Sequence, residues 1–195
     1  MYTRSALSVM LALPALLLAS PAWPAFTLEE LMRTLAQRGP ENARFVEKKY
    51  LAVLDNKPIE SSGELRYVPP NRIEKKTVKP KPESLTVDGD QAVVERGGQR
   101  HTLKLRDYPD IAPFVDSIRG TLAGDRKALE RNYRLSLEGG PQDWVLQLVP
   151  IERTMQAVLK HIRIAGAQDQ LKTVEITQSD GDSSLMVIEK STAAP

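Results

Sequence analysis

The sequence predicts an α+β protein built on a strongly curved antiparallel β-sheet with helices packed against it. Two observations carry this prediction. Apolar and polar residues alternate over most of the chain from residue 43 onward, which is typical of half-buried strands. Two segments, 28–35 and 111–122, instead carry apolar residues at helical spacing. We expect about eleven strands, too many for one flat open sheet, so the sheet should curl.

The first element is a helix that begins after Thr27. Thr27 and Glu30 have the spacing of a capping box, in which each side chain accepts a hydrogen bond from a free backbone N–H of the first turn. The apolar residues of 28–35 then fall on one face. Gly39 and Pro40 are expected to end the helix.

Residues 43 to 105 are predicted to form the first run of strands. The stretch 43–58 suggests one long, half-polar strand, and 63–73 suggests two strands that meet at a Pro-Pro-Asn corner. Proline suits this corner because it fixes φ and has no N–H to donate to a sheet. Gly89 and the pair at 97–98 mark tight hairpin turns.

A second helical block separates this run from another. Its apolar stripe spans 111–122, with Asp110 as the expected N-cap and Gly124 as the stop, and Asp125 caps a short further helix. Strands then resume at residue 133, turn at Gly139-Gly140, and continue as a meander to residue 190.

Composition narrows the class of protein. The chain has 195 residues, a formal charge of +2 and few aromatic residues, which favours a single domain and argues against nucleic-acid binding. The absence of cysteine excludes disulfides, thiolate catalysis and cysteine-based zinc sites. A lysine-rich stretch, 74–82, is expected to be a solvated strand and loop.

The first residues predict export. A basic start, an apolar run that contains Pro14, and small residues before Ala22 indicate a secretory signal peptide over residues 1–22, with Ala25 as the later cleavage alternative. The apolar run is shorter than the roughly 20 residues that cross a bilayer, although a membrane anchor stays open as the minor alternative. We therefore expect one domain over residues 23–195, soluble and periplasmic.

Nothing in the sequence predicts an enzyme. His101 and His161 are the only histidines, and each falls in a predicted strand without a serine or carboxylate pattern as partner. No Walker, Rossmann or HExxH pattern occurs. We expect no catalytic residue, no metal and no cofactor.

Several pieces of the sequence occur together in the order of a known family. They are Phe45, Gly63-x-Leu65, Pro70, "VDG" at 87–89, "WVLQLVP" at 144–150 and "SDGD" at 179–182. On these residues the mature chain resembles the LolA family of periplasmic carriers of outer-membrane lipoproteins. The resemblance implies an incomplete β-barrel whose helices form a lid over an apolar cavity that binds acyl chains. It also implies an acylated cargo, an inner-membrane exporter, an outer-membrane acceptor and a monomeric carrier.

The chain departs from the family at the Pro-Pro-Asn corner. Pro69 stands where typical members have an arginine that helps to hold the lid shut, Ile73 where they have an aromatic residue, and Lys75 where they have tryptophan. The arginine latch therefore has no counterpart at residue 69.

Period and resemblance together give two sets of candidate binding residues. The candidates for the cavity wall are Phe45, Leu65, Tyr67, Ile73, Leu85, Val87, Trp144, Leu146 and Leu148. The candidates for the lid are Leu28, Leu31, Met32, Leu35, Ile111, Phe114, Val115, Ile118 and Leu122.

Three functions stay open at this stage. The first is a carrier that binds lipoprotein acyl chains and delivers them towards the outer membrane. The second is a shuttle or sensor for another lipid or acylated product. The third is a protein-interaction module whose curved sheet is filled by its own side chains, with the lysines of 74–81 as a docking patch for an acidic partner.

Overall fold

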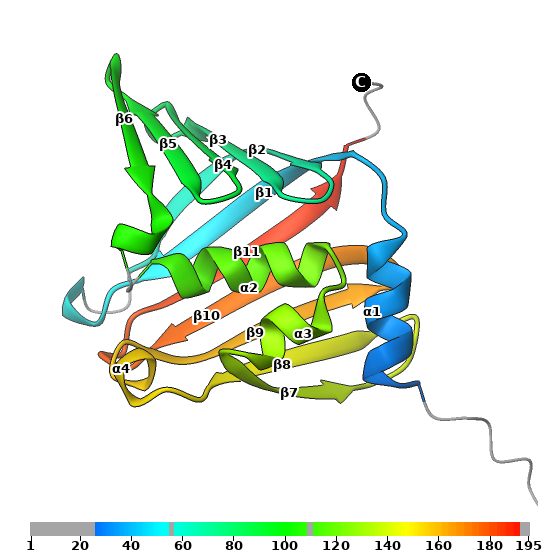
Figure 1. Ribbon diagram of the computed structural model, residues 1–195. Helices are drawn as coiled ribbons and strands as arrows, with labels where there is room; N and C mark the ends of the chain where they lie inside the picture. The colour runs from blue at the N-terminus through cyan, green and yellow to red at the C-terminus, as the bar shows by residue number, and fades with distance from the viewer. Residues whose placement is uncertain (1–25, 55–56, 109–110, 192–195) are drawn as a thin grey trace, which may run out of the picture.

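The computed structural model of the chain describes residues 26–54, 57–108 and 111–191. Eleven strands in this part form one antiparallel sheet that is curved but not closed, with helices packed on it (Figure 1). The predicted fold class is therefore confirmed. The strands are β1 (Glu41–Tyr50), β2 (Ile59–Val68), β3 (Arg72–Lys79), β4 (Glu83–Asp88), β5 (Gln91–Arg96), β6 (Gln99–Lys104), β7 (Tyr133–Glu138), β8 (Trp144–Pro150), β9 (Leu159–Ala167), β10 (Gln170–Gln178) and β11 (Ser183–Lys190).

The spatial order of the strands is β6-β5-β4-β3-β2-β1-β11-β10-β9-β8-β7. Every pair of adjacent strands is consecutive in sequence except at one seam, where β1 pairs with β11 and Ala43 lies opposite Lys190. The two edge strands, β6 and β7, are consecutive along the chain, and the segment between them carries two α-helices. In Figure 1 the first of these helices crosses in front of β10 and β11, on the inner side of the curve.

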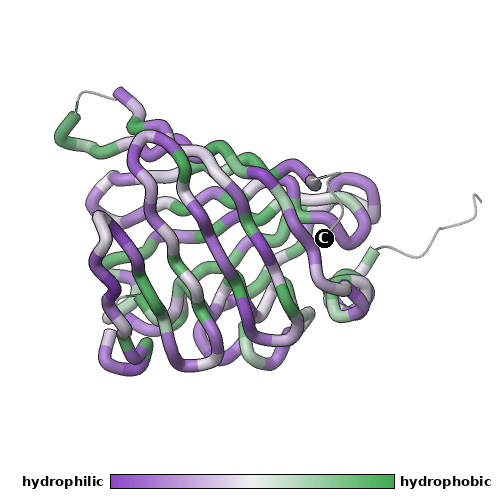
Figure 2. The backbone as a smooth tube through the Cα atoms, turned by 90° about the horizontal axis from the view of Figure 1, so that it is seen from above, coloured by the Kyte–Doolittle hydropathy of each residue, from purple (hydrophilic) through white to green (hydrophobic). Residues whose placement is uncertain are grey.

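Irregular pairings bend the sheet. The register shifts between Ser62 and Gly63 in β2, and twice in β10, between Leu171 and Thr173 and between Thr177 and Gln178. Such bulges kink the strand and increase its twist. Figure 2, which views the molecule from above, shows hydrophilic and hydrophobic residues alternating along the strands. The more hydrophobic face of the sheet can therefore form the interior of the molecule.

Four α-helices accompany the sheet in the described residues. They are α1 (Leu28–Ala36), α2 (Ala112–Leu122), α3 (Arg126–Glu130) and α4 (Arg153–Gln156). Two short 3-10 helices, η1 (Ala52–Leu54) and η2 (Leu105–Asp107), follow β1 and β6. No helix in the described part of the chain has the length and apolar content to cross a membrane.

The capping box of α1 forms as the sequence predicts. The Glu30 amide donates to Thr27 Oγ1 at 3.2 Å, and the Thr27 amide donates to Glu30 Oε2 at 2.8 Å. The Thr27 amide, and after it the Thr27 hydroxyl, lower the pKa of Glu30 by donating to its carboxylate. Gly124 lets the end of α2 approach this helix, because its φ of 63° suits glycine and an added Cβ would meet the backbone of Met32 and Ala36.

Most of the core lies over β7 to β10. Trp144, Leu146 and Leu148 alternate along β8 and are fully buried, and α1 contributes Leu31 and Leu35 to the same cluster. The Trp144 indole Nε1 donates to the Gln168 carbonyl at 3.0 Å. A second, small cluster joins the β4–β5 hairpin to the region before α2. The interior over β7 to β9 is thus filled by side chains.

Three local predictions need comment. The long strand expected over 43–58 ends at Tyr50, where η1 takes over, so that prediction was too long. The short helix α4 falls inside a region expected to be a turn and a strand. The expected N-cap Asp110 and the signal peptide with both cleavage alternatives lie outside the described residues.

Candidate ligand-binding cavity

A cavity of about 710 Å³ lies between the inner face of the sheet and α2. Its walls come from β1 to β4 on one side, β10 and β11 on the other, and one face of α2. Ligand-binding pockets typically measure about 300–1,000 Å³ and are lined mostly by apolar side chains. The size of this cavity and the residues around it fit that description.

The register of β2, β3 and β4 shows which of their side chains face the cavity. Leu65 pairs with Lys75, and Lys75 in turn pairs with Leu85. Side chains two residues apart on a strand share a face. The row of residues two positions further along each strand therefore faces the cavity as well. That second row consists of Tyr67, Ile73 and Val87.

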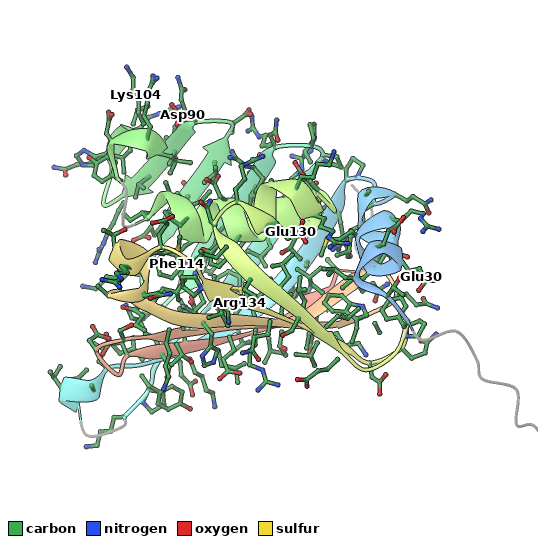
Figure 3. All side chains as sticks on the ribbon, turned by 60° about the horizontal axis from the view of Figure 1, so that its bottom comes forward. Glu30, Asp90, Lys104, Phe114, Glu130 and Arg134 are labelled. Carbon is green, nitrogen blue, oxygen red and sulfur yellow. The ribbon has the colours of Figure 1, made fainter. Side chains whose placement is uncertain are left out.

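One face of α2 provides the opposite wall. Phe114, Val115, Ile118 and Leu122 line the cavity from this helix. Figure 3 labels Phe114, whose side chain lies on the inner side of the molecule, between α2 and the strands. Ser117 and Thr121 of α2 are fully buried, and the Thr121 hydroxyl donates to the Ser117 carbonyl within the helix at 2.8 Å.

Contacts on two sides hold α2 in place. On the β7 side, the Tyr133 hydroxyl donates to the Pro113 carbonyl at 2.9 Å, and Gly120 lies against Leu129 of α3. On the hairpin side, the Arg119 guanidinium donates to the Gly89 carbonyl in the β4–β5 turn. Burial raises the pKa of Tyr133 to about 12, so its hydroxyl remains a donor at neutral pH.

The structure divides the predicted site residues into two groups. Nine of the eighteen line the cavity, namely Leu65, Tyr67, Ile73, Leu85, Val87, Phe114, Val115, Ile118 and Leu122. The others lie outside its lining, and most of these are core residues: Phe45, Trp144, Leu146, Leu148, Leu28, Leu31, Met32 and Leu35 are buried or partly buried. Ile111 is 48% exposed at the start of α2.

The physical reason for this division is the position of α1. The helix packs on the side of the sheet that β7–β9 form and contributes to the filled core, so its apolar stripe does not face the cavity. The side chains of Trp144, Leu146 and Leu148 lie in that same filled region. Periodicity shows that a residue faces inward, but it does not distinguish a filled interior from an open one.

The sequence did not predict the part of the cavity wall that lies beside the β1–β11 seam. Met186 and Ile188 of β11 and Val174 and Ile176 of β10 line the cavity. Their alternation was visible in the sequence, but the pairing of β11 with β1, which brings them next to Ala43, was not.

Charged side chains also line the cavity, and two of them form a pair on the β1–β3 face. Lys75 Nζ lies 2.5 Å from Glu47 Oε2 and 4.9 Å from the centre of the Phe45 ring. About three-quarters of each charged side chain is buried, since 26% of Lys75 and 20% of Glu47 is exposed. Lys75 therefore covers Phe45, and its charge is balanced by a carboxylate.

A second charged group lies around Glu41, six residues before Glu47 on β1. Six residues of strand span roughly 20 Å, so the two groups are well separated. Arg38 pairs with Glu41, and Lys190 Nζ lies 3.8 Å from the same carboxylate. Only 6% of the Arg38 side chain is exposed. Its Nε and Nη1 are buried without a hydrogen-bond partner in the described residues, and such a donor costs roughly 1–3 kcal/mol.

Tyr67 lies in this part of the cavity. Its hydroxyl donates to the Pro70 carbonyl at a long 3.4 Å. Burial raises the pKa of Tyr67, and the nearby Arg38 charge partly opposes that shift. The hydroxyl is therefore neutral at physiological pH.

The two histidines do not meet. His161 Nε2 lies 3.3 Å from Thr177 Oγ1 on the neighbouring strand, and His101 lies on β6 opposite Val94. The described residues contain no group of three His, Cys, Asp or Glu placed to hold a metal ion. What the cavity offers chemically is burial of an apolar ligand with charges near it.

The family model that matches this sequence is described as outer membrane lipoprotein carrier protein LolA-like, and it covers residues 19–194. This chain belongs to the LolA-like family. The family description is that of a carrier, which is a binding protein and not an enzyme. Two of the family departures, Ile73 and Lys75, lie in the cavity lining, so they change the surface that a ligand meets.

Several solved structures are similar to this chain at low sequence identity. One is a LolA superfamily protein from Nitrosomonas europaea, at 11% identity and a TM-score of 0.48 over 88% of this chain and 96% of that chain. Another is the MucA/MucB complex of Pseudomonas aeruginosa, at 13% identity and a TM-score of 0.48 over 86% of this chain and 58% of that chain. A third is the lipoprotein LppX of Mycobacterium tuberculosis, at 11% identity and a TM-score of 0.44 over 86% of this chain and 97% of that chain. Among curated proteins, none matches this sequence.

Proposed function

We propose that this protein is a periplasmic carrier that binds the acyl chains of a lipoprotein in the cavity beneath α2 and delivers them towards the outer membrane. The observation that supports this most is the cavity itself, which has apolar walls on both the sheet side and the helix side. Membership of the LolA-like family and the predicted signal peptide agree with it.

The energetics of such binding are favourable. Each buried methylene contributes about 0.8 kcal/mol, so ten methylenes in the cavity contribute roughly 8 kcal/mol before the cost of ordering the chain. Recognition of this kind is insensitive to the protein part of the cargo. A carrier of many lipoproteins needs that property.

Delivery requires that the ligand leave again. The wall that can move is α2, because the strands around the cavity are held by their ladders and α2 by a few contacts. We propose that an inner-membrane exporter loads the monomeric carrier, that an outer-membrane acceptor unloads it, and that α2 shifts during both steps.

The first test is native mass spectrometry of the mature protein, purified from its own envelope without detergent. A co-purifying acylated peptide or lipoprotein is the expected result. A bound free lipid would instead favour a shuttle or sensor for another acylated product. A bare mass, together with no binding of added fatty acyl probes, would contradict both and favour the protein-interaction module.

A pair of tryptophan variants links the ligand to this cavity. Leu65→Trp places a large side chain in the lining, whereas Val46→Trp places the same side chain on β1 at a residue that is 48% exposed. Leu65→Trp should reduce acyl-probe binding at least ten-fold and Val46→Trp should leave it unchanged. Equal binding by the two variants would place the ligand elsewhere.

The second candidate function, a shuttle for a different acylated lipid, is favoured by one observation. Lys75, Glu47 and Arg38 place charge on the lining of the cavity. A ligand with a charged head would use such groups, and a purely apolar chain would not.

A further inference from the structure

Arg38 occupies an unusual position in the molecule. It lies between the end of α1 and the start of β1, and it lines the cavity although only 6% of its side chain is exposed. Nη2 donates to Glu41 Oε2, while Nε and Nη1 are buried and find no acceptor among the described residues.

Two properties of arginine make this arrangement informative. Buried polar groups almost always have a hydrogen-bond partner. Arginine cannot relieve the deficit by losing its proton, because a guanidinium stays charged in proteins. The two donor atoms therefore call for an acceptor that is supplied from within the cavity.

The local balance of charge indicates what kind of acceptor. Glu41 faces two cations, since Lys190 Nζ lies 3.8 Å from the carboxylate that pairs with Arg38. One negative charge between two positive charges leaves this group net positive. An anionic oxygen is favoured there over a neutral one, and a cation is disfavoured.

The other charged pair of the lining does not share this property. Lys75 lies 2.5 Å from Glu47, and the same carboxylate accepts a hydrogen bond from Ser61 at 3.4 Å. One lysine is thus matched by one carboxylate. Between the two charged groups the lining is apolar, with Leu65 and Ile188 among its residues.

We propose that Arg38 is a head-group site, which binds the carboxylate or phosphate of an acyl ligand whose chain lies along the apolar part of the cavity. This inference rests on the proposed function in one respect, namely that the cavity accepts acyl chains. It adds that the preferred ligand carries an anion at the end of its chain.

The test compares three ligands of equal chain length: laurate, methyl laurate and dodecyl phosphate. Each displaces a fluorescent apolar probe from the wild-type protein at neutral pH, below its critical micelle concentration. We expect laurate, dodecyl phosphate or both to bind at least ten-fold more tightly than methyl laurate. The tighter of the two identifies the head group as carboxylate or phosphate. A preference that survives 0.5 M salt is expected, because a buried ion pair is screened much less than a surface charge.

Two variants assign the preference to Arg38. In Arg38→Gln the preference for the anion should fall below about three-fold, while methyl laurate should bind as before. Arg44→Gln is the matched control, because Arg44 lies on the same strand as Glu41 but is exposed and does not line the cavity. It should keep the preference. If Arg38→Gln does not fold by circular dichroism, Arg38→Lys takes its place and should reduce the preference while retaining part of it.

The outcomes separate this inference from the proposed function. Equal binding of all three ligands by the wild type overturns the head-group site and leaves the carrier intact. An equal loss of preference in Arg44→Gln overturns it as well, since the effect would then come from the general charge of the protein. Failure of all three ligands to displace the probe overturns both proposals.

Discussion

β8 and β3 are strands of the same sheet with the same inward-outward alternation, and they meet different interiors. Trp144, Leu146 and Leu148 of β8 are fully buried under helices. Ile73 and Lys75 of β3 remain partly exposed and line a cavity. The difference shows that the cavity arises from the placement of the helices, since α1 and α3 both pack on the side of the sheet that β7–β9 form.

α2 lies at the boundary between these two regions, which we call the filled half (β7–β9) and the open half (β1–β4 with β10 and β11). Tyr133 and Leu129 attach it to the filled half, and Arg119 attaches it to the open half. Because the filled half supplies burial as well as a hydrogen bond, we expect α2 to stay with that half when the cavity opens.

The largest expected effect is a difference in stability between two identical substitutions. Leu146→Ala removes a fully buried side chain from the filled half and should lower the free energy of unfolding by roughly 3 kcal/mol. Leu65→Ala removes a side chain that already faces the cavity and should cost about 1 kcal/mol. Urea denaturation measures both values. Equal losses would mean that the open half is packed as tightly as the filled half.

The next effect is a pH dependence that comes from the filled half. Burial raises the pKa of Tyr133 to about 12, whereas an unfolded tyrosine titrates near 10. Between pH 10 and 12 the unfolded state loses a proton that the folded state keeps. The free energy of unfolding should therefore fall as pH rises through this range, by at most roughly 2.7 kcal/mol.

Tyr133→Phe is the control for this titration. It should remove the tyrosine's share of the fall above pH 10. Below pH 10 the variant should be less stable by about 1 kcal/mol, because the hydrogen bond to the Pro113 carbonyl is lost. An unchanged pH profile in the variant would assign the fall to other groups.

A third comparison adds methyl groups to each half. In Gly166→Ala the new Cβ would contact the Gln170 carbonyl and the Trp144 indole, so a loss of roughly 1–3 kcal/mol is expected. Ala43→Val adds volume next to the cavity and should cost about 0.5 kcal/mol or less. Thermal unfolding of the two variants ranks them. A larger loss for Ala43→Val would reverse the assignment of filled and open halves.

The smallest expected effect concerns the attachment of α2 to the open half. Arg119→Gln removes the donor to the Gly89 carbonyl and should cost about 0.5–1 kcal/mol, since the side chain is only partly buried. Because that contact holds α2 over the cavity, release of an acyl probe should become several-fold faster in stopped-flow measurements.

Arg126→Gln is the matched control for Arg119→Gln. Arg126 forms an exposed i,i+4 pair with Glu130 within α3, and its loss should change neither stability by more than a few tenths of a kcal/mol nor the release rate. Equal release rates for the two variants would show that Arg119 does not act as a latch.

The sequence predicted the elements well because their signals are local. The capping box of Thr27 and Glu30, the glycine turns and the stripe on α2 depend on residues a few positions apart. The position of the open space depends instead on which half of the sheet each helix covers. Leu65 and Leu146 have the same alternation in sequence, and only the packing of α1 and α3 distinguishes their surroundings.

Arg38 is the clearest case of a site residue without a sequence signal. It stands directly before Gly39 and Pro40, in what reads as an exposed helix end. Its burial follows from the path of the chain from α1 into β1. The attachment of α2 had no sequence signal either: Pro69 has no side-chain donor, and it is Arg119 of α2 that donates to the Gly89 carbonyl.

The seam between β1 and β11 has a consequence for how the chain folds. Every other strand pair joins sequence neighbours, so two meanders can form from local hairpins, whereas the seam unites residues near opposite ends of the chain. Closing so long a loop carries the largest entropic cost, which makes it the expected slow step. Both flanks of the cavity meet at that seam, through Ala43 on one strand and Ile188 on the other. The protein therefore becomes competent to bind only when its last strand docks, and a half-folded chain has no site to fill.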